Sequence, residues 1–220
     1  MQKNMRILNY LLALLIIAFI ALTAFVIQNP FSALDLNISK LVQQHHSATL
    51  DKVMLAISFF GELPWSLVMV LVVAGVFLAF KHRREAYFIT AILSSGLVIL
   101  GAKHIFNRPR PTELYVRLVE INRFQSFPSG HVTSYVLFFG FMIVLMKYMD
   151  HLAPITRKII TYLSVFYIIT IPVSRIYLGA HWFTDVAAGF LLGLICLFPL
   201  CFFYLKRNGD KAMPHPRHLN

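Results

Sequence analysis

Six apolar stretches that suit membrane-spanning helices constrain this chain of 220 residues more than any other feature. They cover residues 7–27, 65–80, 86–106, 128–146, 159–173 and 183–205. The hydrocarbon core of a bilayer is about 30 Å thick, which takes about 20 helical residues to cross. The composition agrees, since only 13% of the residues are charged, against about 25% in soluble domains. The sequence therefore predicts an all-α fold: one polytopic membrane domain over residues 1–220, with six transmembrane helices in a bundle.

Two further structural predictions concern residues 7–27 and residues 50–60. Lys3 and Arg6 precede residues 7–27, which gives the outline of a signal peptide. No small-residue cleavage site follows, and the run is long enough to span, so we expect an uncleaved first helix. Residues 50–60 are mildly amphipathic, which favours a helix lying at the membrane interface.

The basic residues predict an orientation in the membrane. Six spans place both termini on one side, and cytoplasmic loops are enriched in Lys and Arg. That side would carry twelve of the twenty basic residues: Lys3, Arg6, Lys81, Arg83, Arg84, Lys147, Arg157, Lys158, Lys206, Arg207, Lys211 and Arg217. We therefore expect cytoplasmic termini in an inner (cytoplasmic) membrane. The net charge of +11 is explained by these loop ends and by an anionic substrate, and not by nucleic acid.

The segment 174–185 carries the densest chemistry in the chain, reading S-R-I-Y-L-G-A-H-W-F-T-D. His181 and Asp185 are four residues apart, so on a helix they would share one face and touch. A carboxylate that holds an imidazole fixes its tautomer and raises its basicity. Arg175 adds a permanent positive charge. Together these residues suit attack on an anionic centre such as phosphate.

Two further segments end at the same predicted membrane face. Lys103 lies on the last turns of the third span, and the polar segment 107–129 follows with Arg108, Arg110, Arg117 and Arg123. Pro128-Ser129-Gly130-His131 then opens the fourth span. Ser129 is suited to cap that helix, and Gly130 allows a ligand to approach the backbone. Free N–H groups at a helix start bind phosphate well. We assign Arg108 no role, and we expect the adjacent His45 and His46 to be exposed and not to bind a metal.

These segments share a spacing with a known family. Lys103 and Arg110-Pro111 are separated by six residues, and Pro128-Ser129-Gly130-His131 follows sixteen residues later. Ser174-Arg175, five residues, His181, three residues and Asp185 complete the set. This pattern, over residues 103–185, resembles the three-part signature of the type 2 phosphatidic acid phosphatase superfamily. That superfamily includes membrane lipid phosphatases, glucose-6-phosphatase and the soluble vanadium haloperoxidases.

The resemblance implies a role for each residue of the signature. His181 is expected to attack phosphorus and form a phosphohistidine, with Asp185 orienting it. His131 is expected to protonate the leaving oxygen and then to activate water. The implied phosphate-binding residues are Lys103, Arg110, Ser129, Gly130 and Arg175. No metal and no cofactor are implied, because three cations and a helix N-terminus provide the electrostatic stabilisation.

The sequence therefore predicts a metal-independent integral membrane phosphatase whose site opens on the outer side of the membrane. The family implies undecaprenyl diphosphate, phosphatidylglycerophosphate or phosphatidic acid as the substrate. A lipid phosphotransferase using the same phosphohistidine is an alternative enzyme, because the same residues serve both reactions. A non-catalytic anion-binding transporter is an alternative of another class. The chain shows no internal repeat and its polar residues lie at helix ends, which disfavours the transporter.

Overall fold

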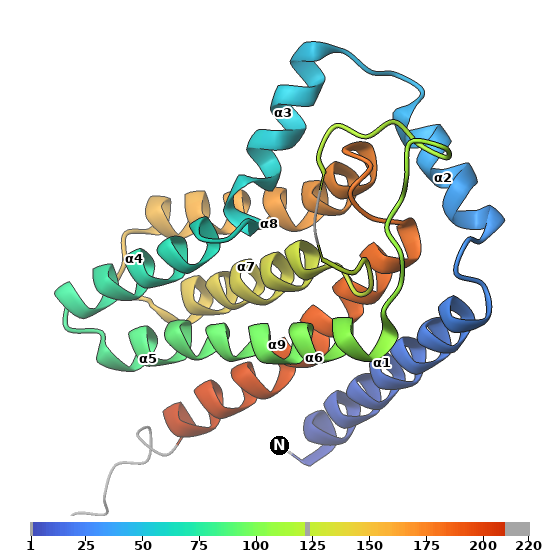
Figure 1. Cartoon of the computed structure of the whole chain (residues 1–220). Helices are drawn as coiled ribbons and strands as arrows, with labels where there is room; N and C mark the ends of the chain where they lie inside the picture. Colours follow the sequence, from blue (N-terminus) through green and yellow to red (C-terminus); the bar gives the residue numbers. More distant parts are fainter. Residues whose placement is uncertain (1, 122–123, 210–220) are drawn as a thin grey trace, which may run out of the picture.

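All regular secondary structure is helical in the part of the chain described by the computed structural model, residues 2–121 and 124–209 (Figure 1). In chain order the elements are α1 (Gln2–Gln28), α2 (Ala33–Gln43), α3 (Ala48–Ser58), the 3-10 turn η1 (Phe59–Gly61), α4 (Trp65–Ala79), α5 (Arg83–Ala91), the 3-10 turn η2 (Ile92–Ser94), α6 (Ser95–Phe106), α7 (Gly130–Tyr148), α8 (Pro154–Tyr177) and α9 (Phe183–Gly209). No strand occurs within these ranges, so the all-α prediction is confirmed.

Within the described residues, five helical segments are long and apolar enough to cross a membrane, or six when one bent pair counts as a single span. The five are Arg6–Gln28, Arg83–Phe106, Gly130–Tyr148, Pro154–Tyr177 and Phe183–Lys206. The predicted second span, residues 65–80, is the single helix α4, but this helix is too short to cross a membrane alone. With 15 residues, α4 is about 22 Å long, which is shorter than the hydrocarbon core. It passes the test only together with Ala48–Gly61, from which it bends by 60°.

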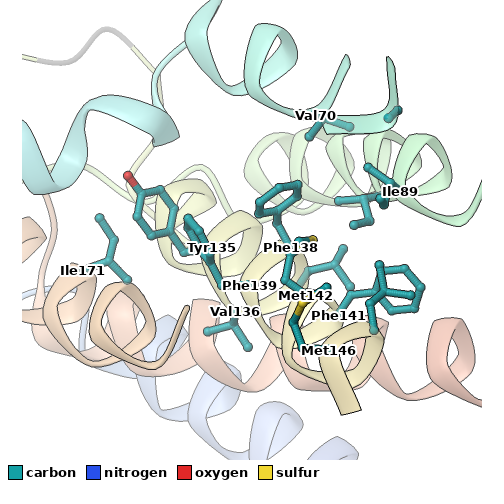
Figure 2. Close-up of a cluster of buried hydrophobic side chains, with 14 of the residues drawn as sticks. Val70, Ile89, Tyr135, Val136, Phe138, Phe139, Phe141, Met142, Met146 and Ile171 are labelled. Carbon is teal, nitrogen blue, oxygen red and sulfur yellow. The ribbon is translucent and has the colours of Figure 1, made fainter. Parts of the chain in front are cut away.

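Helix α7 is the centre of the bundle, and it is buried on nearly all sides. Its buried side chains include Tyr135, Val136, Phe138 and Phe141, which Figure 2 shows among residues from neighbouring helices. The hydroxyl of Tyr135 donates a 2.6 Å hydrogen bond to the carbonyl of Ile57, at the end of α3. A helix that is apolar all round belongs in the interior of the bundle. This position fixes the start of α7, which carries the Pro-Ser-Gly-His sequence, relative to the other helices.

Glycines of α9 allow that helix to pack closely against α7. A Cβ atom at Gly189 would lie 2.6 Å from the Ser129 carbonyl oxygen, and one at Gly193 would lie 2.7 Å from Val136 Cβ. The Thr133 hydroxyl donates to the Gly189 carbonyl at 3.1 Å. Larger residues would force the two helices apart. The beginnings of α7 and α9 are therefore held together.

Helices α2 and α3 lie beside the segment 107–129 at one end of the bundle (Figure 1). The Gln43 side chain of α2 donates to the carbonyls of Arg117 and Tyr177, both at 2.8 Å, and accepts from the Arg117 backbone N–H. The Arg117 guanidinium binds the Asp51 carboxylate of α3 through two hydrogen bonds. Both helices therefore tie the long polar segment down over the end of the bundle where α6 and α8 finish and α7 and α9 begin.

Candidate active site

The eight site residues predicted from the sequence lie together at this end of the bundle. His131 interacts electrostatically with Arg175, His181, Arg110 and Lys103. The backbone N–H of Ser129 donates to the Asp185 carbonyl at 3.0 Å, which joins the starts of α7 and α9. A Cβ atom at Gly130 would lie 3.4 Å from Ile99 Cγ2 and 4.0 Å from Lys103 Cε. The last turns of α6, and with them Lys103, therefore lie against the start of α7.

His181 lies in the turn between α8 and α9 and is 2% exposed. Its Nε2 atom is 3.3 Å from Nη1 of Arg110. Its Nδ1 atom is 3.5 Å from the Ser126 hydroxyl and 3.7 Å from Oδ2 of Asp185. A guanidinium only donates hydrogen bonds, so Nε2 is the acceptor and the proton belongs on Nδ1. This tautomer leaves the Nε2 lone pair directed toward the guanidinium of Arg110.

Burial and nearby positive charge keep His181 neutral. Burial is the largest cause that lowers its pKa well below the ordinary value of 6.5, and the charges of Arg110, Arg175 and Lys103 act in the same direction. The same effects lower the pKa of Arg110 to about 10, with burial again first and Arg175 second. Arg110 therefore stays charged at neutral pH beside an unprotonated imidazole. A neutral nucleophile surrounded by cations is suited to an anionic substrate.

Asp185 reaches His181 by a route different from the expected one. Helix α9 begins at Phe183, so His181 precedes the helix and the two residues do not share a helix face. Oδ2 of Asp185 instead accepts the backbone N–H of Trp182 at 2.9 Å. This is the reciprocal bond of a capping box, which fixes the chain as it enters the helix. The carboxylate reaches the imidazole because the turn folds back at the helix start.

Backbone carbonyls of the segment 107–129 and of the 178–182 turn hold two of the predicted phosphate-binding cations. Lys103 is buried on the last turn of α6, and its ammonium donates to the carbonyl of Gln125. Arg110 donates through Nε to the carbonyl of Phe124 and through Nη1 to the carbonyl of Ala180. Carbonyl oxygens carry only partial charge, so both cations keep net positive charge available for an anion.

Arg175 is fully buried at the end of α8 but is paired differently from expectation. Its Nη1 and Nη2 groups bind the two carboxylate oxygens of Glu120 at 2.8 and 2.7 Å. Nη1 also donates to the Ser58 hydroxyl. The Nε atom is buried and has no hydrogen-bond partner among the described residues. The bidentate pair with Glu120 fixes the plane of the guanidinium and leaves Nε as its free donor.

The start of α7 contributes two more unpaired groups. Ser129 is the N-cap residue, but contrary to expectation its hydroxyl makes no capping hydrogen bond. Its Oγ atom and Nε2 of His131 are buried without a partner in the described part of the chain. Buried polar atoms of this kind are rare. Three of them here, with Nε of Arg175, belong to residues that the signature assigns to the substrate phosphate or the leaving group.

Four residues that contact the site residues were not predicted from the sequence, namely Ser126, Arg108, Asp35 and Glu120. The Ser126 hydroxyl donates to Oδ2 of Asp185 at 2.5 Å. Arg108, which we assigned no role, donates through Nη1 to Oδ1 of Asp185 at 2.5 Å and through Nη2 to Asp35 at 2.8 Å. The Arg108-Pro109 pair, next to Arg110-Pro111, is a sequence signal that could have pointed to Arg108. No sequence signal pointed to Asp35 or Glu120. Their partners are distant in sequence, and only the fold brings them together.

Metal-ligand clusters are absent from the described residues, in which no group of three His, Cys, Asp or Glu side chains is placed to hold an ion. His45 and His46 are exposed, as expected. The cations whose charge acts on His181 are Arg110, Arg175 and Lys103.

Comparisons with known proteins show which family and which relatives this chain resembles. The model of the PAP2 superfamily matches residues 84–209. The chain is 28% identical over 199 residues to phosphatidylglycerophosphatase B of Bacillus subtilis, covering 90% of this chain and 94% of that protein. It is 30% identical over 169 residues to an undecaprenyl-diphosphatase of Sulfolobus acidocaldarius, covering 72% and 73%.

Two solved structures are similar in fold. A transmembrane PAP2-type phosphatidylglycerolphosphate phosphatase from Bacillus subtilis superposes with a TM-score of 0.77 and 23% identity, over 94% of this chain and 98% of that one. LpxE of Aquifex aeolicus superposes with a TM-score of 0.60 and 25% identity, over 78% and 97%.

Proposed function

The chain belongs to the PAP2 superfamily, and from that premise we propose that it is a membrane phosphatase that removes the terminal phosphate of a lipid phosphate or diphosphate. The observation that carries the proposal is the 3.3 Å distance between Nη1 of Arg110 and Nε2 of His181. An anion bound by this arginine is delivered to the nitrogen that is free to attack. The low pKa of His181 supports the same role, because the imidazole is unprotonated at neutral pH.

In the first step Nε2 of His181 attacks phosphorus, and the bond from phosphorus to the leaving lipid oxygen breaks. His131 donates the proton that the leaving oxygen takes up. The Nδ1 proton stays directed at the Asp185 carboxylate, which stabilises the positive imidazole ring as it forms. Lys103, Arg110 and Nε of Arg175 bind the phosphoryl oxygens and stabilise the charge that builds on them. The product of this step is a phosphohistidine.

In the second step water takes the place of the leaving group, which is a lipid alcohol from a lipid phosphate and a lipid monophosphate from a diphosphate. His131, now unprotonated, accepts a proton from the water as it attacks phosphorus, and the bond from phosphorus to Nε2 breaks. Inorganic phosphate leaves and His181 regains its neutral form. The cations that bind the phosphoryl group serve both steps, so the cycle as proposed requires no metal ion.

The lipid substrate is inferred from the membrane fold and from the relatives. The site lies at one end of a bundle with five or six candidate spans, where a phosphate head at the surface and an apolar tail among helices fit together. The relatives are named for phosphatidylglycerophosphate and undecaprenyl diphosphate. We propose substrates of this class, and we propose that the site faces outward with cytoplasmic termini, because the sequence pattern assigns twelve basic residues to the opposite ends of the spans.

The test is phosphate release by the purified protein in detergent with EDTA present. Undecaprenyl diphosphate, phosphatidylglycerophosphate and phosphatidic acid are assayed side by side, with His181→Ala as the inactive variant. His45→Ala is the matched control, because His45 is exposed and outside the site. We expect EDTA-resistant release that only His181→Ala abolishes. Equal silence of wild type and His181→Ala on all three lipids would reject the proposed function.

A further inference from the structure

Arg108 connects three parts of the chain through one buried guanidinium. Its Nε and Nη2 groups donate to the carbonyl of Pro30, at 3.2 and 2.8 Å. Nη2 also donates to Oδ2 of Asp35, and Nη1 donates to Oδ1 of Asp185. The side chain is buried, at 3% exposure for the residue. A charge removed from water in this way is costly unless it is paired, and here two carboxylates pair with it.

Asp35 on α2 has a complete set of partners of its own. Its Oδ1 atom accepts the backbone N–H of Thr184 at 2.8 Å, and Oδ2 accepts the hydroxyls of Ser32 and Thr184 at 2.7 and 3.0 Å. The residue has no exposed surface. Asp35 therefore holds Arg108 from one side and the first turn of α9 from the other, although it precedes the segment matched by the family model.

The orientation of the Asp185 carboxylate follows from these contacts. Arg108 occupies Oδ1, while Oδ2 accepts from Ser126 and from the Trp182 backbone. With Oδ1 held at 2.5 Å by a fixed guanidinium, the carboxylate cannot rotate without breaking an ion pair. Oδ2 is thereby kept on the side of Nδ1 of His181, 3.7 Å away.

We infer that Arg108 and Asp35 are positioning residues that set the Asp185 carboxylate, and through it the tautomer and direction of the His181 imidazole. Neither residue touches the phosphate in this account. The inference rests on the proposed function for its kinetic consequence, but its structural consequence, the state of the His181 ring, is independent of any substrate. In metal sites, loss of the group that orients a functional imidazole changes metal affinity or activity about 10–100-fold, and we expect an effect of the same size here.

The test uses Arg108→Gln and Asp35→Asn in the full-length protein. Asp35→Asn keeps the size of the side chain but replaces the carboxylate with an amide that cannot satisfy both Arg108 and Thr184. Asp51→Asn is the matched control, since Asp51 also anchors the 107–129 segment to an N-terminal helix through an arginine but does not contact Asp185. Size-exclusion profile and thermal unfolding establish that each variant is folded.

Two readouts separate positioning from mere folding. We expect kcat for lipid phosphate hydrolysis to fall about 10–100-fold in both variants, with KM near wild type because the phosphate-binding cations are untouched. We also expect the ¹⁵N imidazole signal of His181, identified by its loss in His181→Ala, to move away from the Nδ1-protonated form. Asp51→Asn is expected to leave kcat and this signal as in wild type.

Each outcome decides the inference. A wild-type kcat and an unchanged His181 signal in Asp35→Asn would overturn it, and so would equal changes in Asp51→Asn. If Arg108→Gln does not fold, Asp35→Asn alone gives the answer. If wild type hydrolyses no lipid phosphate, the proposed function fails, and the ¹⁵N signal still shows whether Arg108 and Asp35 set the ring.

Discussion

The Nη1 atom of Arg110 lies 3.3 Å from Nε2 of His181, while two backbone carbonyls hold the rest of the guanidinium in place. The arrangement couples binding to attack. A phosphate group that binds the Arg110 guanidinium in place of His181 lies next to the lone pair of Nε2. Reacting groups held about 3 Å apart in the correct direction gain much of their rate from this placement alone.

Arg110→Lys is predicted to lower kcat/KM about 10²–10³-fold, the effect of losing one donor to developing negative charge. Lysine keeps the charge, but its single ammonium cannot bind the Phe124 and Ala180 carbonyls and face His181 together. Phosphate release from a lipid phosphate measures the effect. Arg83→Lys, at an exposed position on α5, is the matched control. A kcat/KM for Arg110→Lys within a factor of about three of wild type would contradict the role.

Gly61→Ala is predicted to lower kcat by displacing the His131 ring, although His131 itself is unchanged. A Cβ atom at Gly61 would overlap Cδ2 of His131, so the ring must move. A displacement of this kind lowers the rate about 100-fold. Gly75→Ala is the control, because no atom lies within 4 Å of its added Cβ. Equal kcat values for the two alanine variants would show that the position of His131 is unimportant.

The pKa of His181 predicts a pH effect whose sign follows from burial. The ring stays neutral in the native protein well below pH 6.5, whereas the unfolded chain takes up a proton near pH 6.5. The contribution of His181 to the free energy of unfolding is therefore fully present above pH 6.5 and is lost as the pH falls below that value. Titration of the His181 ¹⁵N signal measures the native value directly. A midpoint at or above 6.5 would contradict the desolvated, cation-surrounded environment.

Ser126→Ala is predicted to lower kcat about fivefold, because one hydrogen bond to Asp185, worth about 1 kcal/mol, is removed beside the His181 ring. Ser164→Ala is the matched control, since Ser164 is also buried but bonds only to the carbonyl of Ile160 in its own helix. Steady-state phosphate release compares the two. If Ser164→Ala lowers kcat as much as Ser126→Ala does, the effect is general loosening of the bundle.

The helical membrane architecture was predictable because runs of apolar residues long enough to span a membrane can be identified from the local sequence alone. The bend between α3 and α4 was not, since the break at residues 62–64 separates two apolar runs that the sequence pattern treats as one short span and one surface helix. The geometry of the contact between His181 and Asp185 was not predicted either, although the start of the sixth span at residue 183 was. A spacing of four suggests a shared helix face, but the bond from the Trp182 N–H to Asp185 begins the helix after His181.

The candidate site residues were predictable because their spacing is fixed within three short segments. The residues that hold these side chains in place were not predictable. Arg108 carries a visible charge, yet its partners Asp35 and Asp185 lie 73 and 77 residues away, and no local pattern connects them. The pairing of Arg175 with Glu120 is of the same kind, which is why the sequence pattern assigned the whole guanidinium of that arginine to the substrate.

The most direct test of the account is to trap the covalent intermediate. Wild-type protein is mixed with a lipid phosphate carrying ³²P in its terminal phosphate, quenched within one turnover, and analysed for acid-labile, base-stable label. We predict label on His181 in the wild type, none in His181→Ala, and unchanged labelling in His45→Ala. Turnover by the wild type with no label on His181 at any quench time, or full turnover by His181→Ala, would contradict the phosphohistidine mechanism.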